Sequence, residues 1–420
     1  MQSLIPQRVT SIPTFGWFAL IAALFSAFGQ TFFIGLFGAE FQKALSLNAA
    51  GLGYLYGSAT LLSGLLMFWL GELADRLLMS RAIAISLMIL VVGAVLVSMA
   101  HEPLSLWVGF LLLRLGGQGL TGHLAIVAAA RYALKNRGRS VAMASYGFII
   151  AEASFPLFLA GLLNLLDWRQ VWWVAATVLV LVAMPTLVAM ARTFGGVDPL
   201  ERSAGGPVDL HKSGRPLPKR QLTRWTLLIE PKFVLTLPMV LGSAFVITAL
   251  FLHQGSLAEI KQWPLSVIAT AFVLFAVSQA VVAFVTGRLI DAFGSVVLLR
   301  FFLWPMAGAL CVLGFGDSAN GIWWVFAGLG ATAGANGVLA GAIWAELFGL
   351  KQLGLIRGVY AAFMVGSSAI APMLFGQFLQ LQWPLSWVAV MGVFFGVVLP
   401  QILVPFIKGL QAKNQRGALQ

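Results

Sequence analysis

Long runs of apolar residues separated by short polar gaps dominate this chain. Each run is continuously apolar rather than alternating, and about 20 apolar residues are enough for an α-helix to cross the hydrocarbon core of a bilayer. Because helices satisfy their own backbone polar groups, the pattern predicts an all-α membrane protein with transmembrane helices. Twelve such runs are present: 15–38, 49–70, 82–100, 105–131, 140–164, 171–192, 231–254, 266–286, 296–315, 320–344, 357–380 and 386–407.

A short polar motif of the form Gly-x-Leu-x-Asp occurs twice at a fixed offset. It occupies residues 71–75 and returns at residues 287–291, 216 positions later, and Pro156 and Pro372 keep the same offset. We expect each copy to lie in a polar gap between two apolar runs. The constant offset indicates two halves with the same helices in the same order, hence two pseudo-symmetric six-helix bundles.

The segment 193–230 differs in composition from the rest of the chain. It contains Gly205-Gly206-Pro207, Pro216, Pro218 and the basic pair Lys219-Arg220, with almost no clustering of apolar residues. Such a composition is typical of a linker. We therefore expect an N-terminal bundle over 1–192, a cytoplasmic linker over 193–230 and a C-terminal bundle over 231–420.

Composition and charge support the same class of protein. Hydrophobic residues make up 60% of the chain, charged residues 10%, and the mean hydropathy is +0.93. A water-soluble domain could not bury so much apolar surface. If both termini are cytoplasmic, all 26 Lys and Arg residues lie in or beside cytoplasmic segments except Lys43, Arg114, Arg169 and Lys261. The positive-inside rule thus explains the net charge of +12, and nucleic-acid binding is not needed to explain it.

The sequence contains none of the motifs that are typical of an enzyme or an ATP-driven pump. There is one cysteine, Cys311, no Walker-type phosphate-binding motif, and no spacing typical of a metal site or a nucleophile–base pair. We expect neither an enzyme nor an ATP-driven pump, and we predict no cofactor and no metal.

Two charged residues lie deep in predicted helices. Arg114 is about nine residues into the fourth span and Glu152 about twelve residues into the fifth, so at about 1.5 Å per residue both lie near the same depth. Because burying an unpaired charge is costly, such residues are functional candidates. Two interpretations follow: a structural ion pair within the N-terminal bundle, or an Arg114 that attracts an anionic substrate beside a Glu152 that exchanges a proton.

Further polar side chains are candidates for contact with a substrate or a proton. On an α-helix, Gln118 and Thr121 share a stripe with Arg114. We predict a central cavity lined by the first, fourth, seventh and tenth spans, which carry the remaining candidates: Gln30, His253, Gln254 and Asn336. For the pair His253-Gln254, an anchor at the membrane interface is the alternative, and for Asn336 close helix packing is an equal alternative.

The first polar motif, with Arg76 and Arg81, resembles the loop signature between helices two and three of the major facilitator superfamily. Leu78 stands where that signature has its second glycine, whereas the second copy keeps this glycine at Gly294. The resemblance implies a secondary transporter that works by alternating access. It also implies a gating role for five residues: Gly71, Asp75, Arg76, Gly287 and Asp291. Capping of the loop alone is the structural alternative.

A second resemblance concerns the cargo. The string from Arg114 to His123, together with Glu152, His253-Gln254 and the segment 346–357, is similar to a bacterial group of monocarboxylate and oxalate/formate transporters. That group has a basic residue in helix eight or eleven, where this chain has Gln279 and Ser367-Ser368. The resemblance implies a small organic anion as substrate, with proton coupling as a further expectation, in a multi-pass protein of the bacterial inner membrane. The alternatives are a multidrug or amphiphile exporter and a non-transporting membrane receptor on the same fold.

Overall fold

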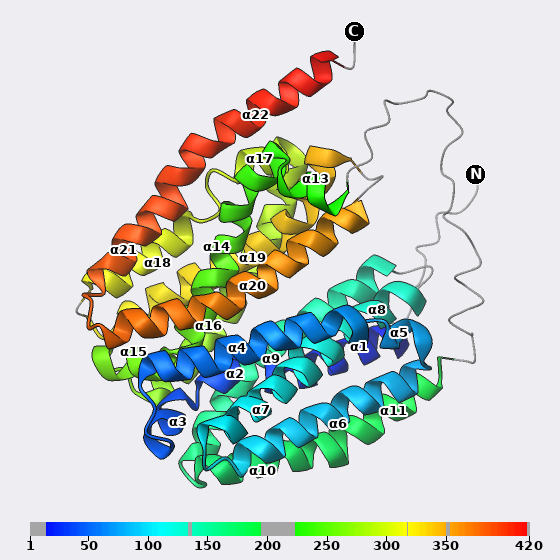
Figure 1. The fold of residues 1–420 in the computed structure, drawn as a ribbon, viewed down its shortest axis with the longest axis vertical. Helices are drawn as coiled ribbons and strands as arrows, with labels where there is room; N and C mark the ends of the chain where they lie inside the picture. Colours follow the sequence, from blue (N-terminus) through cyan, green and yellow to red (C-terminus); the bar gives the residue numbers. More distant parts are fainter. Residues whose placement is uncertain (1–13, 133–136, 195–222, 317, 350–352, 418–420) are drawn as a thin grey trace, which may run out of the picture.

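The computed structural model describes residues 14–132, 137–194, 223–316, 318–349 and 353–417. Within these residues the chain is helical and contains no strand, which confirms the predicted all-α class. The helices form two bundles that lie against each other (Figure 1). The first bundle consists of α1 (Thr14–Ser26), η1 (Ala27–Gly29), α2 (Thr31–Gly35), α3 (Gly38–Ala44), α4 (Ala49–Leu70), α5 (Leu73–Arg76), α6 (Met79–Ser98), α7 (Pro103–Leu113), η2 (Arg114–Thr121), α8 (Gly122–Tyr132), α9 (Arg137–Leu163), α10 (Trp168–Val178), η3 (Leu179–Ala183) and α11 (Met184–Arg192).

The second bundle repeats this order of spans. It consists of α13 (Arg224–Leu228), α14 (Pro231–Leu252), α15 (Gln254–Lys261), α16 (Leu265–Phe293), α17 (Ser295–Leu298), α18 (Trp304–Phe315), α19 (Gly321–Phe348), α20 (Leu353–Gln380), α21 (Ser386–Val393), η4 (Phe394–Val398) and α22 (Leu399–Gly417). Of the predicted linker 193–230, residues 195–222 lie outside the described residues, and α13 lies within its last part.

Among the described residues, eleven helical spans are long and apolar enough to cross a membrane. The ninth predicted run, 296–315, is divided: the short helix α17 is followed by the apolar helix α18, which begins at Trp304. Pro305 stands at the start of α18, a position that proline favours because its missing N–H is not needed there. The architecture is therefore the predicted one of twelve helices in two bundles.

Polar residues begin several helices. The Asn48 side chain accepts a hydrogen bond from the backbone N–H of Gly51 at 2.7 Å, and Asp167 accepts bonds from the N–H groups of Arg169 and Gln170. These caps satisfy N–H groups that have no partner within the helix. The capping residues Asn48 and Asp167 thus mark where the short connections end and where α4 and α10 begin.

Rows of small residues bring the two bundles close together. On α4, a Cβ at Gly53 would lie 2.3 Å from the Pro372 carbonyl oxygen of α20, and one at Gly57 would lie 2.4 Å from the Ala369 carbonyl oxygen. Small residues let helix backbones approach in this way inside a membrane. α9 and α16 form a second contact between the bundles.

The second polar motif does not lie in a gap between helices. The sequence predicts that the eighth span ends at 286, but α16 continues to Phe293 and includes both Gly287 and Asp291. The helix ends at Gly294, which has the left-handed φ of +80° that favours glycine. The prediction was wrong because a helix can extend beyond the apolar run that marks its membrane-embedded part.

Candidate functional site

The first span is broken near its middle. α1 passes into the short helix η1, then Gln30 adopts an extended conformation (φ −87°, ψ 150°), and α2 restarts at Thr31. Backbone groups at such a break lose their helical partners, and broken helices are a common feature of the substrate sites of transporters. Gln30, a predicted site residue, is thus the residue at which the helix is interrupted.

The fourth span is irregular at the same level. Residues Arg114–Thr121 form a π-helix, η2, and π-helical turns occur often at functional sites. The two irregular segments touch, because a Cβ at Gly29 would lie 2.1 Å from the Leu113 carbonyl oxygen, and one at Gly117 would lie 2.6 Å from the Gly29 Cα. Only glycine fits at both positions. We take this junction as the candidate site because the broken first span and the π-helix η2 meet here.

Arg114 is the charged residue of this junction, and its side chain is 4% exposed. One guanidinium nitrogen donates to the Gly29 carbonyl oxygen at 3.2 Å and to the Thr31 hydroxyl at 3.4 Å. The guanidinium carbon lies 5.3 Å from the centre of the Tyr56 ring, and the Tyr56 and Thr31 hydroxyls are 2.6 Å apart. The Arg114 Nε has no hydrogen-bond partner. Neutral groups therefore hold the Arg114 guanidinium, and its Nε–H can still donate a hydrogen bond to a ligand.

The ion pair between Arg114 and Glu152, one of the two interpretations of these residues, is not formed in the described part of the chain. Among the described residues, which include both of these side chains, the one ion pair within 4.0 Å joins Glu72 and Arg76. Glu152 instead interacts with the Gln279 side chain of α16 in the other bundle, and its Oε2 has no hydrogen-bond partner. Counting residues along a helix gives the depth of a side chain but not its direction around the helix, so the sequence could not decide between the two interpretations.

Thr121 does not share a stripe with Arg114. Its side chain is fully buried, and its hydroxyl donates to the Gly116 carbonyl oxygen at 2.7 Å and lies 2.6 Å from the Ser86 hydroxyl of α6. A π-helix, with its i→i+5 hydrogen bonds, has more residues per turn than an α-helix. Residues seven positions apart, such as Arg114 and Thr121, therefore no longer lie on the same side of the helix. Gln118 lies within the same π-helix, and its Oε1 is buried without a partner.

His253 and Gln254 lie together at another place, the end of the molecule where α3 and α15 meet (Figure 1). The His253 Nε2 is 2.9 Å from the Pro372 carbonyl oxygen, and the Gln254 Nε2 donates to the Phe32 carbonyl oxygen of the first bundle at 3.0 Å. The bundles also meet here through glycine, since a Cβ at Gly35 would lie 1.8 Å from the Phe251 carbonyl oxygen. These contacts close the α3–α15 end.

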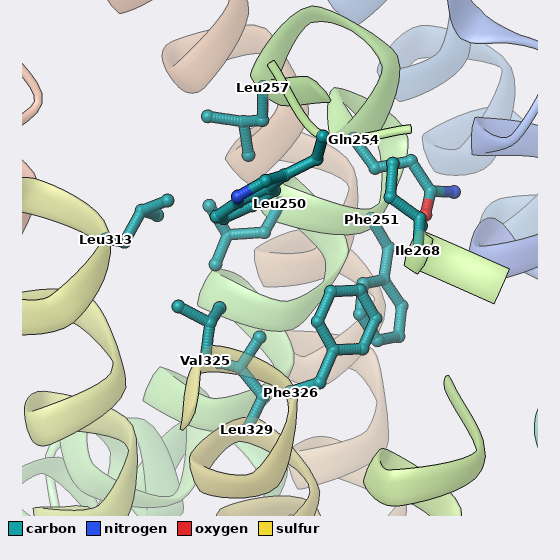
Figure 2. Close-up of a pocket in the computed structure, with 10 residues that line it drawn as sticks. Leu250, Phe251, Gln254, Leu257, Ile268, Leu313, Val325, Phe326 and Leu329 are labelled. Atoms are coloured by element: carbon teal, nitrogen blue, oxygen red, sulfur yellow. The ribbon is translucent and has the colours of Figure 1, made fainter. Parts of the chain in front are cut away.

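Gln254 also borders a small cavity of about 20 Å³ inside the second bundle. Figure 2 shows its amide pointing away from Leu257 and Leu313 on the opposite side of this cavity. A cavity of this size has room for about one water molecule. It is too small for an organic substrate.

The remaining predicted residues are dispersed. Asn336 of α19 interacts with the Tyr360 side chain of α20. Arg76 pairs with Glu72 four residues earlier at 2.5 Å, and both side chains are exposed. Gly71 follows α4, whereas the Asp75 side chain lies outside the described residues. Asp291 is exposed near the end of α16.

Several side chains in these contacts were not predicted as site residues, among them Tyr56, Gln279 and Glu346. Tyr56 is a polar aromatic residue in an apolar run, which is a signal that the sequence offers. For Gln279 the sequence offers only its position, where the transporters that the chain resembles have a basic residue. Glu346 accepts hydrogen bonds from the Ser295 N–H, at 2.6 Å, and from the Ser295 hydroxyl, and so joins α19 to α17. Its partner could not be inferred from spacing.

Comparison with known proteins identifies the family. The sequence model of the Major Facilitator Superfamily matches residues 19–257, more than half of the chain. The chain belongs to the Major Facilitator Superfamily. It is therefore a membrane transporter rather than an enzyme, and the twelve-helix architecture described above is that of this family.

Solved structures of transporters share the fold. The nucleoside transporter NupG aligns with a TM-score of 0.71 at 12% identity, covering 94% of this chain and 99% of its own. A POT family transporter in complex with 5-aminolevulinic acid gives 0.67 at 14% identity, covering 96% and 97%. A bacterial homolog of the human lysosomal transporter Spinster gives 0.58 at 16% identity, covering 97% and 95%. No curated protein matches the sequence. At these identities the likeness concerns the fold alone.

Proposed function

We propose that this member of the Major Facilitator Superfamily transports a small organic anion, such as a monocarboxylate, and binds it at Arg114. One observation carries the proposal: a buried guanidinium that none of the described carboxylates pairs with, at the junction of the broken first span and the π-helix η2. An unpaired cation in a membrane interior is costly. A carboxylate is the partner that a guanidinium binds best, by two parallel hydrogen bonds.

The neighbours of Arg114 suit such a ligand. Tyr56 and Thr31 hold the guanidinium in place, and its Nε remains free to donate. Gln118 adds an amide from the same π-helix, and Gln30 adds one at the break of the first span. We assign these two amides, and that of Asn336 in the opposite bundle, to polar contacts with the cargo.

We further propose that Glu152 couples transport to protons. Its carboxyl group faces the neutral amide of Gln279 across the contact between α9 and α16, and one of its oxygens has no partner. When the bundles move relative to each other, this contact opens and the carboxyl group gains water. A carboxyl group whose surroundings alternate between dry and wet releases its proton in the wet state.

The distribution of Lys and Arg supports an orientation with both termini in the cytoplasm and the α3–α15 end outside, in the inner membrane of a bacterium. In this orientation His253 and Gln254 help to close the outer end. The same orientation puts the end of α4, the short helix α5 and the end of α16 on the cytoplasmic side. We assign the residues of the two motifs there to gating: Gly71, Asp75, Arg76, Gly287 and Asp291.

Uptake into proteoliposomes tests the class of cargo. The purified protein is supplied with labelled short-chain carboxylates, with neutral sugars of similar size, and with amphiphilic drugs. We expect saturable uptake of at least one carboxylate, and stimulation of this uptake by an inward proton gradient. Transport confined to amphiphilic drugs would instead identify an exporter of such compounds. Transport of none of the three, by protein that remains folded, would favour a receptor.

A further inference from the structure

A cavity of about 480 Å³ lies between the two bundles at the α3–α15 end. We call it the α3–α15 vestibule. Its walls come from α3 and the end of α9 on one side, and from α15 and the start of α16 on the other. Volumes of about 300–1,000 Å³ are typical of sites for small organic ligands. The vestibule is a different place from the Arg114 junction.

The chemistry of the vestibule is acidic and aromatic. Each bundle contributes one carboxylate, Glu40 from α3 and Glu259 from α15, and both side chains line the cavity. Within the described part of the chain, neither carboxylate is in an ion pair. Trp263, Leu36 and Leu163 form an apolar wall. A cationic ligand with an apolar body matches both features, because carboxylates and indole rings attract ammonium groups.

A buried polar group provides independent support. Gln254 lines the vestibule and is 5% exposed, and while its Nε2 is bound to the Phe32 carbonyl oxygen, its Oε1 has no partner. A buried amide oxygen without a donor is unfavourable, so a ligand hydroxyl or N–H that reaches it would be bound favourably. The oxygen is an acceptor and thus complements a ligand that carries donors and positive charge.

The basic residues nearby do not neutralise this surface. The Lys261 ammonium donates to the Gly316 carbonyl oxygen at 2.9 Å, on the side of α18, and does not line the cavity. Lys43 lies in the last turn of α3 and is likewise not part of its lining.

From these observations we propose that the α3–α15 vestibule is a binding site for a small organic ammonium ion, distinct from the transport site. The site exists only while the bundles are closed at this end, since its two carboxylates belong to different bundles. A ligand that touches both walls binds the closed state more tightly and shifts the protein toward it. The ammonium ion therefore stabilises the conformation in which the α3–α15 end is closed.

Binding is tested on the full-length protein in detergent by calorimetry with choline as the probe. The neutral isostere 3,3-dimethylbutan-1-ol, which lacks only the charge, is the matched ligand control. We expect choline to bind and the isostere to bind at least about tenfold more weakly, because two carboxylates and an indole ring attract the ammonium ion together. Equal binding of the two compounds, or no binding of choline, overturns the proposal.

Variants locate the site. Glu40→Gln and Glu259→Gln should each weaken choline binding by about fivefold or more, because each removes half of the negative charge around the ammonium ion. Glu102→Gln is the matched control: it makes the same change at an exposed position that does not line the vestibule. Choline affinity unaffected by both vestibule variants, in protein that elutes as the wild type does, places the ligand elsewhere and contradicts the assignment.

Cross-linking tests whether the ammonium ion stabilises the closed α3–α15 end. The Ser256 hydroxyl donates to the Gln42 side-chain oxygen at 3.2 Å, across the boundary between the bundles. With Cys311→Ala as background, the pair Gln42→Cys and Ser256→Cys reports closure of this end through the yield of cross-linked protein. Choline should raise the yield, and the isostere should not. If choline lowers the yield or leaves it unchanged, the ligand does not stabilise the closed end and this part of the proposal is refuted.

Discussion

At the scale of single residues, the structure separates two charges that the sequence places at one depth. Arg114 is bound by neutral groups of the first bundle, whereas Glu152 meets Gln279 of the second. Their roles should therefore separate experimentally. We predict that Glu152→Gln abolishes the dependence of net uptake on a proton gradient while substrate exchange continues, because the amide cannot take up a proton. Counterflow and gradient-driven uptake in proteoliposomes measure the two activities, and loss of both together would contradict a role in coupling alone.

Tyr56 provides a second prediction at this scale. Its hydroxyl lies 2.6 Å from that of Thr31, which in turn accepts from Arg114. Tyr56→Phe keeps the ring beneath the guanidinium but removes this hydroxyl. We expect protein of nearly normal stability with a higher KM for the anion, since Arg114 loses part of its positioning and keeps its charge. An unchanged KM in transport assays would show that the hydroxyl has no part in the site.

At the scale of elements, the junction of the broken first span and the π-helix η2 depends on glycine. A Cβ at Gly29 would meet backbone atoms at 2.1 and 2.8 Å, which no side-chain movement can relieve. Gly29→Ala should therefore destabilise the protein by about 2–4 kcal/mol and lower its thermal unfolding temperature. Gly161→Ala in α9 is the matched control, because nothing lies within 4 Å of its added methyl group. There we expect no loss of stability, since alanine favours a helix more than glycine does.

Most of the elements, but fewer of their mutual contacts, could be predicted from the sequence. The apolar runs define eleven spans closely, because membrane insertion requires length and hydrophobicity, which are local properties. The π-helix was not predictable, and it rotated Thr121 away from the Arg114 side. The partner of Glu152 was also hidden, because it depends on how one bundle packs on the other. The chemistry of the site was thus predicted in part, and its geometry was not.

At the scale of the whole molecule, the two bundles are closed at the α3–α15 end by backbone contact. A Cβ at Gly35 would lie 1.8 Å from the Phe251 carbonyl oxygen, so Gly35→Ala should force this end apart. We predict faster reaction of a cysteine at Ser256 with a water-soluble maleimide, in a Cys311→Ala background, when Gly35→Ala is added. Gly308→Ala, which adds a methyl group in open space, is the control. An unchanged labelling rate would show that the contact does not hold the end closed.

The central claim is that Arg114 binds the anion, and direct binding of a transported carboxylate tests it without the complications of gating. Calorimetry on detergent-solubilised wild type, Arg114→Lys and Arg114→Gln gives the three affinities, with thermal unfolding to verify that each variant is folded. We predict that Arg114→Gln loses binding by about 100-fold or more, while Arg114→Lys retains part of it, as expected when a charge-assisted bidentate contact is reduced to a point charge and then removed. Folded Arg114→Gln protein that binds the carboxylate as tightly as the wild type would contradict the claim.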